Sequence, residues 1–124
     1  MGEVKRLETI RPHYKLEAWK LSRKLVADIY KLTQSFPKEE LFGLTSQMRR
    51  AAISIPSNIA EGAARTGSKE FSQFINIAKG SLSELETQLL IAADLGYLEE
   101  AHPVFSVVDR VSRIITGLHK AVRS

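Results

Sequence analysis

The chain has 124 residues, of which 44% are hydrophobic and 26% are charged, a composition typical of one globular domain. It contains no cysteine, which excludes disulfides, thiolate metal sites and cysteine nucleophiles. No apolar run approaches the roughly 20 residues of a membrane span, and the N-terminus shows no apolar signal region. We therefore predict a cytoplasmic protein without a membrane segment.

The formal net charge of +4 is concentrated at the start of the chain. Residues 1–24 carry seven basic and three acidic side chains, whereas the rest of the chain carries eleven of each sign. This basic segment is expected to contact nucleic acid or another anionic surface; the alternative is a solvated terminus. Residues 1–13 show no periodicity, so we predict an irregular basic segment there and one folded domain over residues 14–124.

The first predicted helix covers about residues 14–35. Apolar side chains recur at steps of three and four, which indicates one buried face: Ala18, Leu21, Leu25, Ile29, Leu32 and Phe36. Basic side chains fall on or near the other face: Lys20, Arg23, Lys24 and Lys31. The pair Phe36-Pro37 is expected to end the helix, because the residue before a proline avoids the helical region.

The second predicted helix covers about residues 41–65 and contains a proline. Its apolar stripe consists of Met48, Ala52, Ile55, Ile59 and Ala63. Because Pro56 lacks an N–H and crowds the preceding turn, we predict a kink there. Polar residues form a predicted structural cluster with one residue of the next helix: Ser54, Ser57, Asn58, Glu61 and Glu84. They either cap a bent helix locally or form a buried cluster that selects one packing arrangement or partner.

The third predicted helix, about residues 69–95, is the longest. We expect Gly67 to adopt a left-handed cap conformation and Ser68 to cap the new helix. The main stripe consists of Phe71, Ile75, Ala78, Leu82, Leu85, Leu89 and Ala92. A second, half-polar line consists of Ile77, Ser81, Glu84, Gln88, Ile91 and Leu95. This second line either meets another copy of the chain or belongs to a broad face inside the core.

Gly96 is expected to end the third helix, and Pro103 to lie in the first turn of the fourth. The stripe of the fourth helix consists of Val104, Val108, Val111, Ile115, Leu118 and Val122. Four amphipathic helices without strand-like alternation predict an all-α fold, an antiparallel up-and-down four-helix bundle whose second helix is kinked at Pro56.

We predict neither a catalytic site, nor a metal site, nor a cofactor. A di-metal bundle needs two Glu-x-x-His motifs, and this chain has one, Glu99 to His102, in a turn. Glu61, Glu84 and Asn58 are where a catalytic pocket would be sought, but no motif supplies a nucleophile beside them. Electrostatic contact with phosphates is the better-supported chemistry. The candidate side chains are Lys15, Lys20, Arg23, Lys24, Arg49, Arg50, Arg65 and Lys69, although Arg50 has Glu61 or Glu84 as alternative partners.

A family resemblance is carried by residues 42–62, with the sequence FGLTSQMRRAAISIPSNIAEG. This run resembles the signature of the small bacterial four helix bundle protein family, also called 23S rRNA intervening-sequence proteins. The agreement extends over about residues 14–100. Further matching positions are Leu16, Trp19, residues 29–33, Phe36-Pro37, Phe71, Phe74, Ile77-Ala78, residues 80–89 and residues 95–97.

The resemblance implies a ring-like homopentamer without catalytic residues. It also relates the chain to accessory proteins of diversity-generating retroelements, which are basic pentamers that bind nucleic acid and a reverse transcriptase. Five copies, each of charge +4, would carry +20 and attract RNA or DNA non-specifically. We therefore expect a non-enzymatic, homo-oligomeric scaffold that binds RNA or DNA. The alternative is a protein-interaction module or accessory subunit without nucleic-acid binding.

Overall fold

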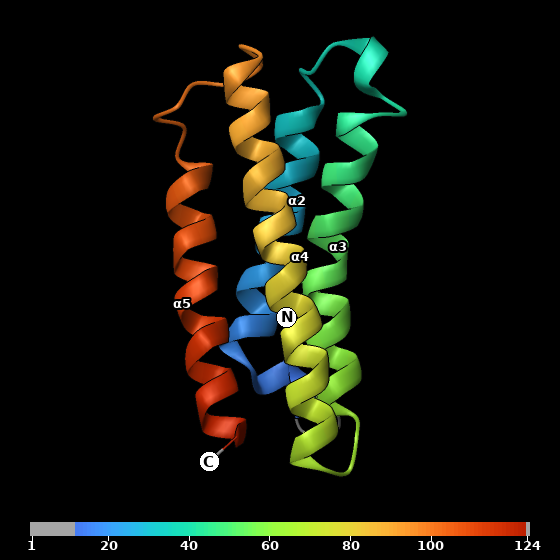
Figure 1. The fold of residues 1–124 in the computed structure, drawn as a ribbon, viewed down its shortest axis with the longest axis vertical. Coiled ribbons are helices and arrows are strands. Elements are labelled where there is room, and N and C mark those ends of the chain that lie inside the picture. Colours follow the sequence, from blue (N-terminus) through green and yellow to red (C-terminus); the bar gives the residue numbers. More distant parts are fainter. Residues whose placement is uncertain (1–11, 124) are drawn as a thin grey trace, which may run out of the picture.

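The computed structural model of the protein describes residues 12–123. Two short 3-10 helices, η1 (Pro12–Lys15) and η2 (Lys38–Glu40), accompany four long helices (Figure 1). The long helices are α2 (Glu17–Thr33), α3 (Leu44–Ala63), α4 (Ser68–Asp94) and α5 (Val104–Arg123). The described residues contain no strand, so the predicted all-α four-helix fold is confirmed. The predicted irregular segment, residues 1–13, lies almost entirely outside the described residues.

The four long helices pack around a common axis. Helix α2 contacts α3 and α5, and α4 contacts the same two helices from the other side. Figure 1 shows the chain direction reversing from each long helix to the next. Helices α2 and α5 therefore form one side of the bundle, and α3 and α4 form the opposite side.

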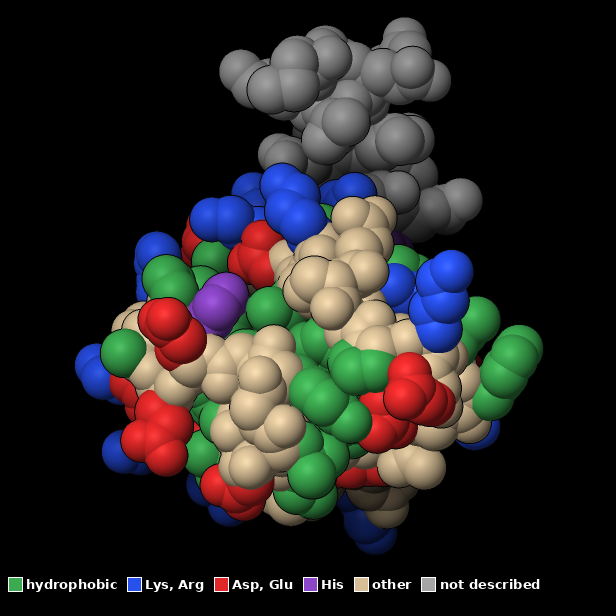
Figure 2. Space-filling view, turned by 90° about the horizontal axis from the view of Figure 1, so that it is seen from above, with side chains coloured by type: hydrophobic (Ala, Val, Ile, Leu, Met, Phe, Trp, Pro, Cys, Tyr) green, Lys and Arg blue, Asp and Glu red, His purple; other side chains and the backbone are tan. Residues whose placement is uncertain are grey.

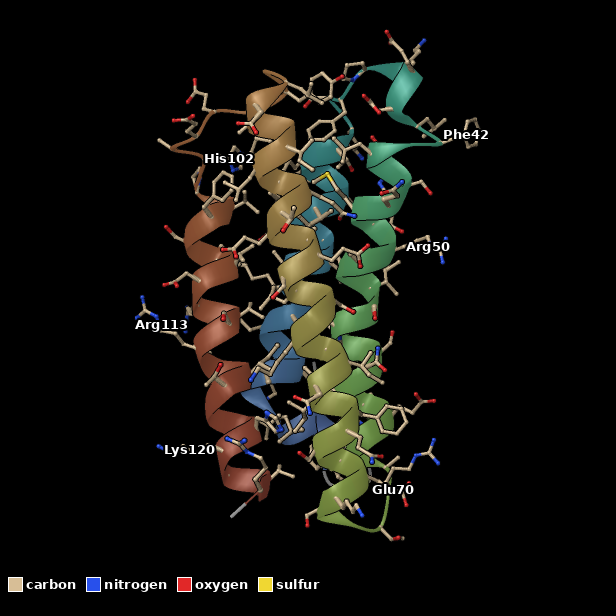
Figure 3. The ribbon with its side chains drawn as sticks, viewed as in Figure 1. Phe42, Arg50, Glu70, His102, Arg113 and Lys120 are labelled. Carbon is tan, nitrogen blue, oxygen red and sulfur yellow. The ribbon has the colours of Figure 1, made fainter. Side chains whose placement is uncertain are left out.

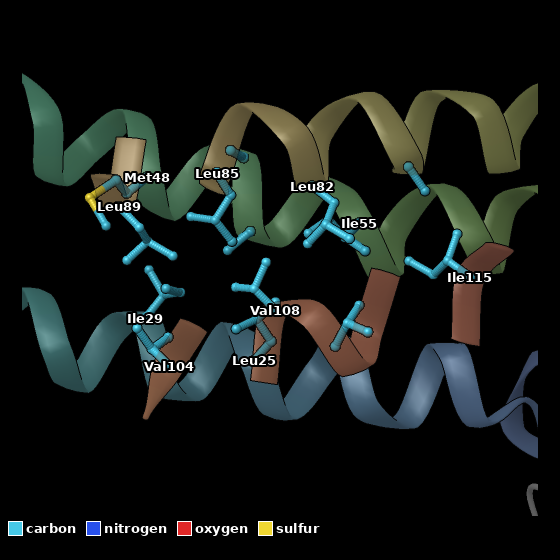
Figure 4. Packing of buried hydrophobic residues seen from close by; sticks show 14 of the residues in the cluster. Leu25, Ile29, Met48, Ile55, Leu82, Leu85, Leu89, Val104, Val108 and Ile115 are labelled. Atoms are coloured by element: carbon cyan, nitrogen blue, oxygen red, sulfur yellow. The ribbon is translucent and has the colours of Figure 1, made fainter. Parts of the chain in front are cut away.

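The core is built from the predicted apolar stripes. Most stripe residues on every long helix are buried, and the remainder pack against the buried cluster. Figure 4 shows side chains from all four helices meeting between the ribbons; those with no exposed area include Leu25, Ile29, Met48, Ile55, Leu85 and Leu89. Figure 2 views one end of the bundle along its long axis. Hydrophobic side chains are visible near the middle of this end, and charged side chains lie around its rim. Burial of these stripes is the main stabilising term, because removing apolar surface from water is favourable.

The structure corrects the prediction for the connection between α3 and α4. Gly67 is not left-handed: its φ and ψ are −118° and 147°, and it immediately precedes Ser68, the first residue of α4. Gly67 is thus the N-cap of α4 and makes no side-chain cap, whereas we expected Ser68 at that position. The physical reason is the short connection, residues 64–67, in which the residue before the next helix takes the extended conformation usual for an N-cap.

Other helix ends lie close to their predicted positions. Helix α3 begins at Leu44 rather than residue 41, because residues 41–43 form a turn. It runs through Pro56 without a break in assignment, so a bend at Pro56 stays a prediction. Helix α4 ends before Gly96, whose φ of +81° is the left-handed conformation expected after a helix. Helix α5 begins at Val104, directly after Pro103.

One end of the bundle is tied together by a tyrosine. The hydroxyl of Tyr97, after α4, donates a hydrogen bond of 2.8 Å to Oε2 of Glu40 in η2. The Tyr97 ring also packs on Phe36, with 5.4 Å between the ring centroids. The second carboxylate oxygen of Glu40 accepts the backbone N–H of Leu44 at 3.3 Å. These contacts hold the chain that follows α4 against the start of α3.

The second line of α4 lies outside the core of the described chain. Ile77, Ile91 and Leu95 are 51%, 43% and 54% exposed. Leu95 directly follows the last residue of α4. The line runs on the side of α4 near α3, because Ser81 on this line hydrogen-bonds to Ser54 of α3, whereas Gln88 on the same line is buried. Three large apolar side chains on one helix face therefore remain in contact with solvent.

Candidate nucleic-acid interface

An exposed ridge of lysines runs along the outer side of α2. Lys20, Lys24 and Lys31 are all exposed, and spacings of four and seven residues place them on one helix face. Lys20 and Lys24 belong to the predicted phosphate-binding set. The side chain of Lys15, a further predicted candidate, lies outside the part of the chain that the structure describes.

Two of the predicted arginines stack on aromatic rings of the protein. The guanidinium carbon of Arg23 lies 4.6 Å from the Trp19 ring centroid, and that of Arg49 lies 4.5 Å from the Tyr30 centroid. Arg49 Nε also donates to Thr33 Oγ1 at 2.9 Å, and its Nη2 donates to the Tyr30 carbonyl at 3.4 Å. Arg49 consequently links α3 to α2, and its donors are directed into the protein.

Arg65 lies between two carboxylates beside the connection from α3 to α4. Its Nη2 is 4.0 Å from Glu61 Oε1, and its Nε is 4.0 Å from Glu70 Oε2. The guanidinium carbon is also 5.0 Å from the centroid of the Phe74 ring. These acids balance the charge of Arg65 locally, while the neighbouring Lys69 is exposed.

A polar groove separates the outer sides of α3 and α4. Its lining residues are Gln47, Arg50, Ala51, Ser54, Ser81 and Glu84. The hydroxyls of Ser54 and Ser81 lie 2.8 Å apart across the groove and form a hydrogen bond. Arg50 projects away from the bundle (Figure 3) and makes no ion pair with another described residue. The groove thus brings predicted Arg50 and Glu84 to one place without pairing them.

The predicted polar cluster is only partly assembled. Asn58 Nδ2 donates to the Ser54 carbonyl at 2.7 Å and to the Ser54 hydroxyl at 2.9 Å, which holds its amide against the groove. Ser57 instead lines a groove between α3 and α2, and Glu61 is exposed beside Arg65. The predicted set therefore divides between the two flanks of α3 instead of forming one site.

Sequence reasoning missed a buried histidine. His119 on α5 is only 4% exposed, and its Nε2 lies 2.8 Å from the Ser72 hydroxyl on α4. Burial lowers the pKa of His119, and the positive charges of Arg123 and Lys79 lower it further. The signal was present in the pattern, because His119 lies four residues after Ile115 on the apolar stripe of α5.

Within residues 12–123, no three His, Asp or Glu side chains gather closely enough to hold a metal ion. No helix among the described residues is long and apolar enough to cross a membrane.

The helices that carry the lysine ridge and the polar groove match one protein family. The sequence pattern of this family, described as 23S rRNA-intervening sequence protein, matches residues 14–117. The chain belongs to this family. No curated protein matches the chain. The matched region includes all of α2, α3 and α4 and most of α5, so the family relationship covers every long helix of the bundle.

Proposed function

We propose that this member of the 23S rRNA-intervening sequence protein family is a non-enzymatic scaffold of the cytoplasm that assembles as a homopentamer and binds RNA or DNA. Family membership supports the proposal, because the resemblance described above relates this family to basic pentamers that bind nucleic acid. The net charge of +4 and a sequence pI near 9.5 support attraction to a polyanion. Assembly would multiply that charge on one particle.

The second line of α4 supports self-association. Ile77, Ile91 and Leu95 lie about half exposed along one helix, beside the small polar side chains of the groove. Apolar side chains that recur along an exposed face are typical of surfaces that meet another chain, and equal copies of one chain usually assemble with closed symmetry. We expect this line to form the contact between neighbouring copies.

Native mass spectrometry of the full chain, with and without a short RNA, tests both parts of the proposal. We expect a discrete oligomer of five subunits that gains the mass of the RNA at low ionic strength. Binding should weaken steeply as salt is raised, because phosphate contacts release counterions. Absence of RNA binding at low salt, or an affinity that does not change with salt, would contradict the nucleic-acid role. A monomer would contradict the assembly.

A protein-interaction module is the second candidate, and one exposed aromatic residue favours it. Phe42 is 94% exposed and projects from the connection before α3, next to Leu41, which is 49% exposed (Figure 3). Such side chains cost free energy in water and anchor protein contacts when a partner covers them. Recovery of one defined protein after nuclease treatment, abolished in the Phe42→Ser variant, would favour this alternative over nucleic-acid binding.

A further inference from the structure

The charges of the bundle are divided unequally between its two sides. Helices α2 and α5 together carry eight Lys and Arg against three Asp and Glu, a net charge of +5. Helices α3 and α4 carry four Lys and Arg against five Asp and Glu, a net charge of −1. Since α2 packs beside α5 and α3 beside α4, this difference in sequence becomes a difference between opposite sides of the molecule.

The exposed basic side chains of α2 and α5 lie on the outer sides of two neighbouring helices, and we call them together the α2–α5 basic face. It consists of Lys20, Lys24 and Lys31 on α2 and Arg110, Arg113 and Lys120 on α5, all exposed. Val107, one turn before Arg110, lines a pocket together with Asp28 and Lys31, which shows that this flank of α5 adjoins α2. Figure 3 shows Arg113 and Lys120 projecting from α5, on the opposite side of the bundle from Arg50.

Few acids neutralise this face. Asp109 pairs with Arg113 one turn along α5, but Lys24, Lys31, Arg110 and Lys120 make no ion pair with another described residue. A net positive surface of this kind concentrates polyanions near the protein.

The composition of the face favours a phosphate backbone over a protein partner. Among the described residues, the large hydrophobic side chains that are exposed lie on α3, on α4, directly after α4 or in the connection before α3, with one exception. The exception is Tyr30 on α2, whose ring is covered by the Arg49 guanidinium. Protein interfaces contain an apolar centre, whereas contacts with nucleic-acid backbones are polar and strongly basic.

The same composition favours a duplex over a single strand. Proteins that bind single strands stack bases on open aromatic rings. The described aromatic rings of α2 and α5 are not open on this face: Trp19 lies under Arg23, and Phe105 is packed against the core. Lys20 to Lys31 and Arg110 to Lys120 each span about 15–17 Å of rigid helix, from the rise of about 1.5 Å per residue. Rigid rows of cations without stacking rings fit the regularly spaced phosphates of a duplex.

We propose that the α2–α5 basic face binds the phosphate backbone of a nucleic-acid duplex without reading its sequence. This inference rests on the proposed nucleic-acid function and goes beyond it by naming the surface, the α5 residues and the class of ligand. Arg49, which donates a hydrogen bond to Thr33, and Arg65, which lies 4.0 Å from a Glu61 carboxylate oxygen, are not part of this surface.

Matched pairs of substitutions in the full chain test the surface. The variants Lys24→Gln/Lys31→Gln and Arg110→Gln/Lys120→Gln each remove two charges from the face. The control Lys38→Gln/Lys79→Gln removes two charges from lysines elsewhere, in η2 and α4, that belong neither to the face nor to the predicted binding set. Affinity for a short RNA duplex is measured over a series of salt concentrations, and native mass spectrometry confirms that each variant keeps the wild-type subunit count.

Log affinity falls with log salt concentration, and we expect each face variant to reduce the magnitude of this slope by about two, because each removed cation no longer neutralises one phosphate. The control should leave the slope unchanged. An equal decrease in all three variants would show that binding follows net charge, which overturns the face but leaves the proposed function standing. Tighter binding of the separated strands than of their duplex would overturn the ligand class. Absence of binding by the wild-type chain would overturn the proposed function itself, and poly-glutamate that binds in place of RNA would identify an acidic protein as the ligand.

Discussion

Gly62 on α3 lies so close to Phe74 on α4 that a β-carbon at position 62 would be 2.7 Å from the Phe74 Cβ. It would also be 2.9 Å from Cδ1 of Phe71 and 3.3 Å from the Phe71 carbonyl oxygen. The Phe74 Cβ is attached directly to the α4 backbone and cannot rotate away. The two helices pack at this separation only because residue 62 has no side chain.

Replacing Gly62 with Ala is therefore expected to destabilise the protein. Overpacking of this kind costs about 1–3 kcal/mol, which exceeds the gain of roughly 0.5–1 kcal/mol from the better helix propensity of Ala. The matched control is Gly117→Ala in α5, where a β-carbon would meet no atom within 4 Å. It should raise stability by about the propensity term. The urea concentration at the unfolding midpoint measures the stability of each variant. Equal shifts in the two variants would contradict the close approach of Gly62 to Phe74.

The free energy of unfolding should decrease as the pH falls from the ordinary pKa of histidine toward the lower pKa of His119 in the folded protein. The pKa of His119 is lowered in the folded protein by burial and by the nearby cations Arg123 and Lys79. Between its ordinary pKa of 6.5 and the lower folded value, the unfolded chain binds a proton that the folded chain does not, so stability rises with pH in that window. The comparison is the unfolding free energy at several pH values for the wild type and His119→Leu.

The difference between these two curves isolates the histidine, because both proteins contain the same carboxylates. We expect the wild-type protein to lose stability relative to His119→Leu as the pH falls through this window. Parallel curves would mean that His119 does not titrate differently in the two states. Ser72→Ala serves as a second variant, since it removes the hydroxyl 2.8 Å from Nε2 but leaves the histidine buried.

Tyr97 should titrate at a higher pH than an ordinary tyrosine. Its hydroxyl donates to Glu40, which raises the pKa of the phenol, and burial and the negative charges of Glu40 and Glu39 raise it further. The Glu40→Gln variant should lower the pKa of Tyr97 toward its ordinary value of 10.0. Tyrosinate absorbance during an alkaline titration measures this, with Tyr97→Phe identifying which transition belongs to this residue. An unchanged Tyr97 transition in Glu40→Gln would show that the hydrogen bond is absent in solution.

Substitution on the second line of α4 should dissociate the oligomer. Ile91→Glu places a charge among the apolar side chains that we propose lie between copies, where a buried unpaired carboxylate is costly. Leu90→Glu is the matched control, because Leu90 is similarly exposed (53% against 43% for Ile91) but lies about 100° away around the helix. Native mass spectrometry should show fewer subunits only for Ile91→Glu. Loss of assembly in both variants, or in neither, would argue against this line as the interface.

Periodicity in the sequence was sufficient to predict the four long helices and most of the core. Met48, Ile55 and Ile59 were assigned to a buried stripe from their spacing, and all three have no exposed area. The reason is local: a helix repeats every 3.6 residues, so a helix packed on a core must repeat its apolar residues at that interval. Gly96 was also correctly placed after α4, since its role depends on the backbone of one residue.

Contacts between helices could not be predicted in the same way. Ser54 meets Ser81, 27 residues away, and Tyr97 meets Glu40, 57 residues away. The predicted polar cluster divided between the two flanks of α3 because its members are spaced around more than one face of the helix. Gly67 was misassigned because its conformation depends on the next helix as well as on the one before.

The sequence by itself determined the fold class, the family signature, the net charge and which residues face inward, because these depend on composition and on spacing within single helices. Only the tertiary structure decided which helices are neighbours. That arrangement places the basic helix α2 beside the basic helix α5, directs Nε of Arg49 to Thr33, and leaves Ile77 and Ile91 exposed. Interactions between charges depend on their distance in space, so the electrostatic character of a surface depends on which segments, far apart along the chain, pack side by side.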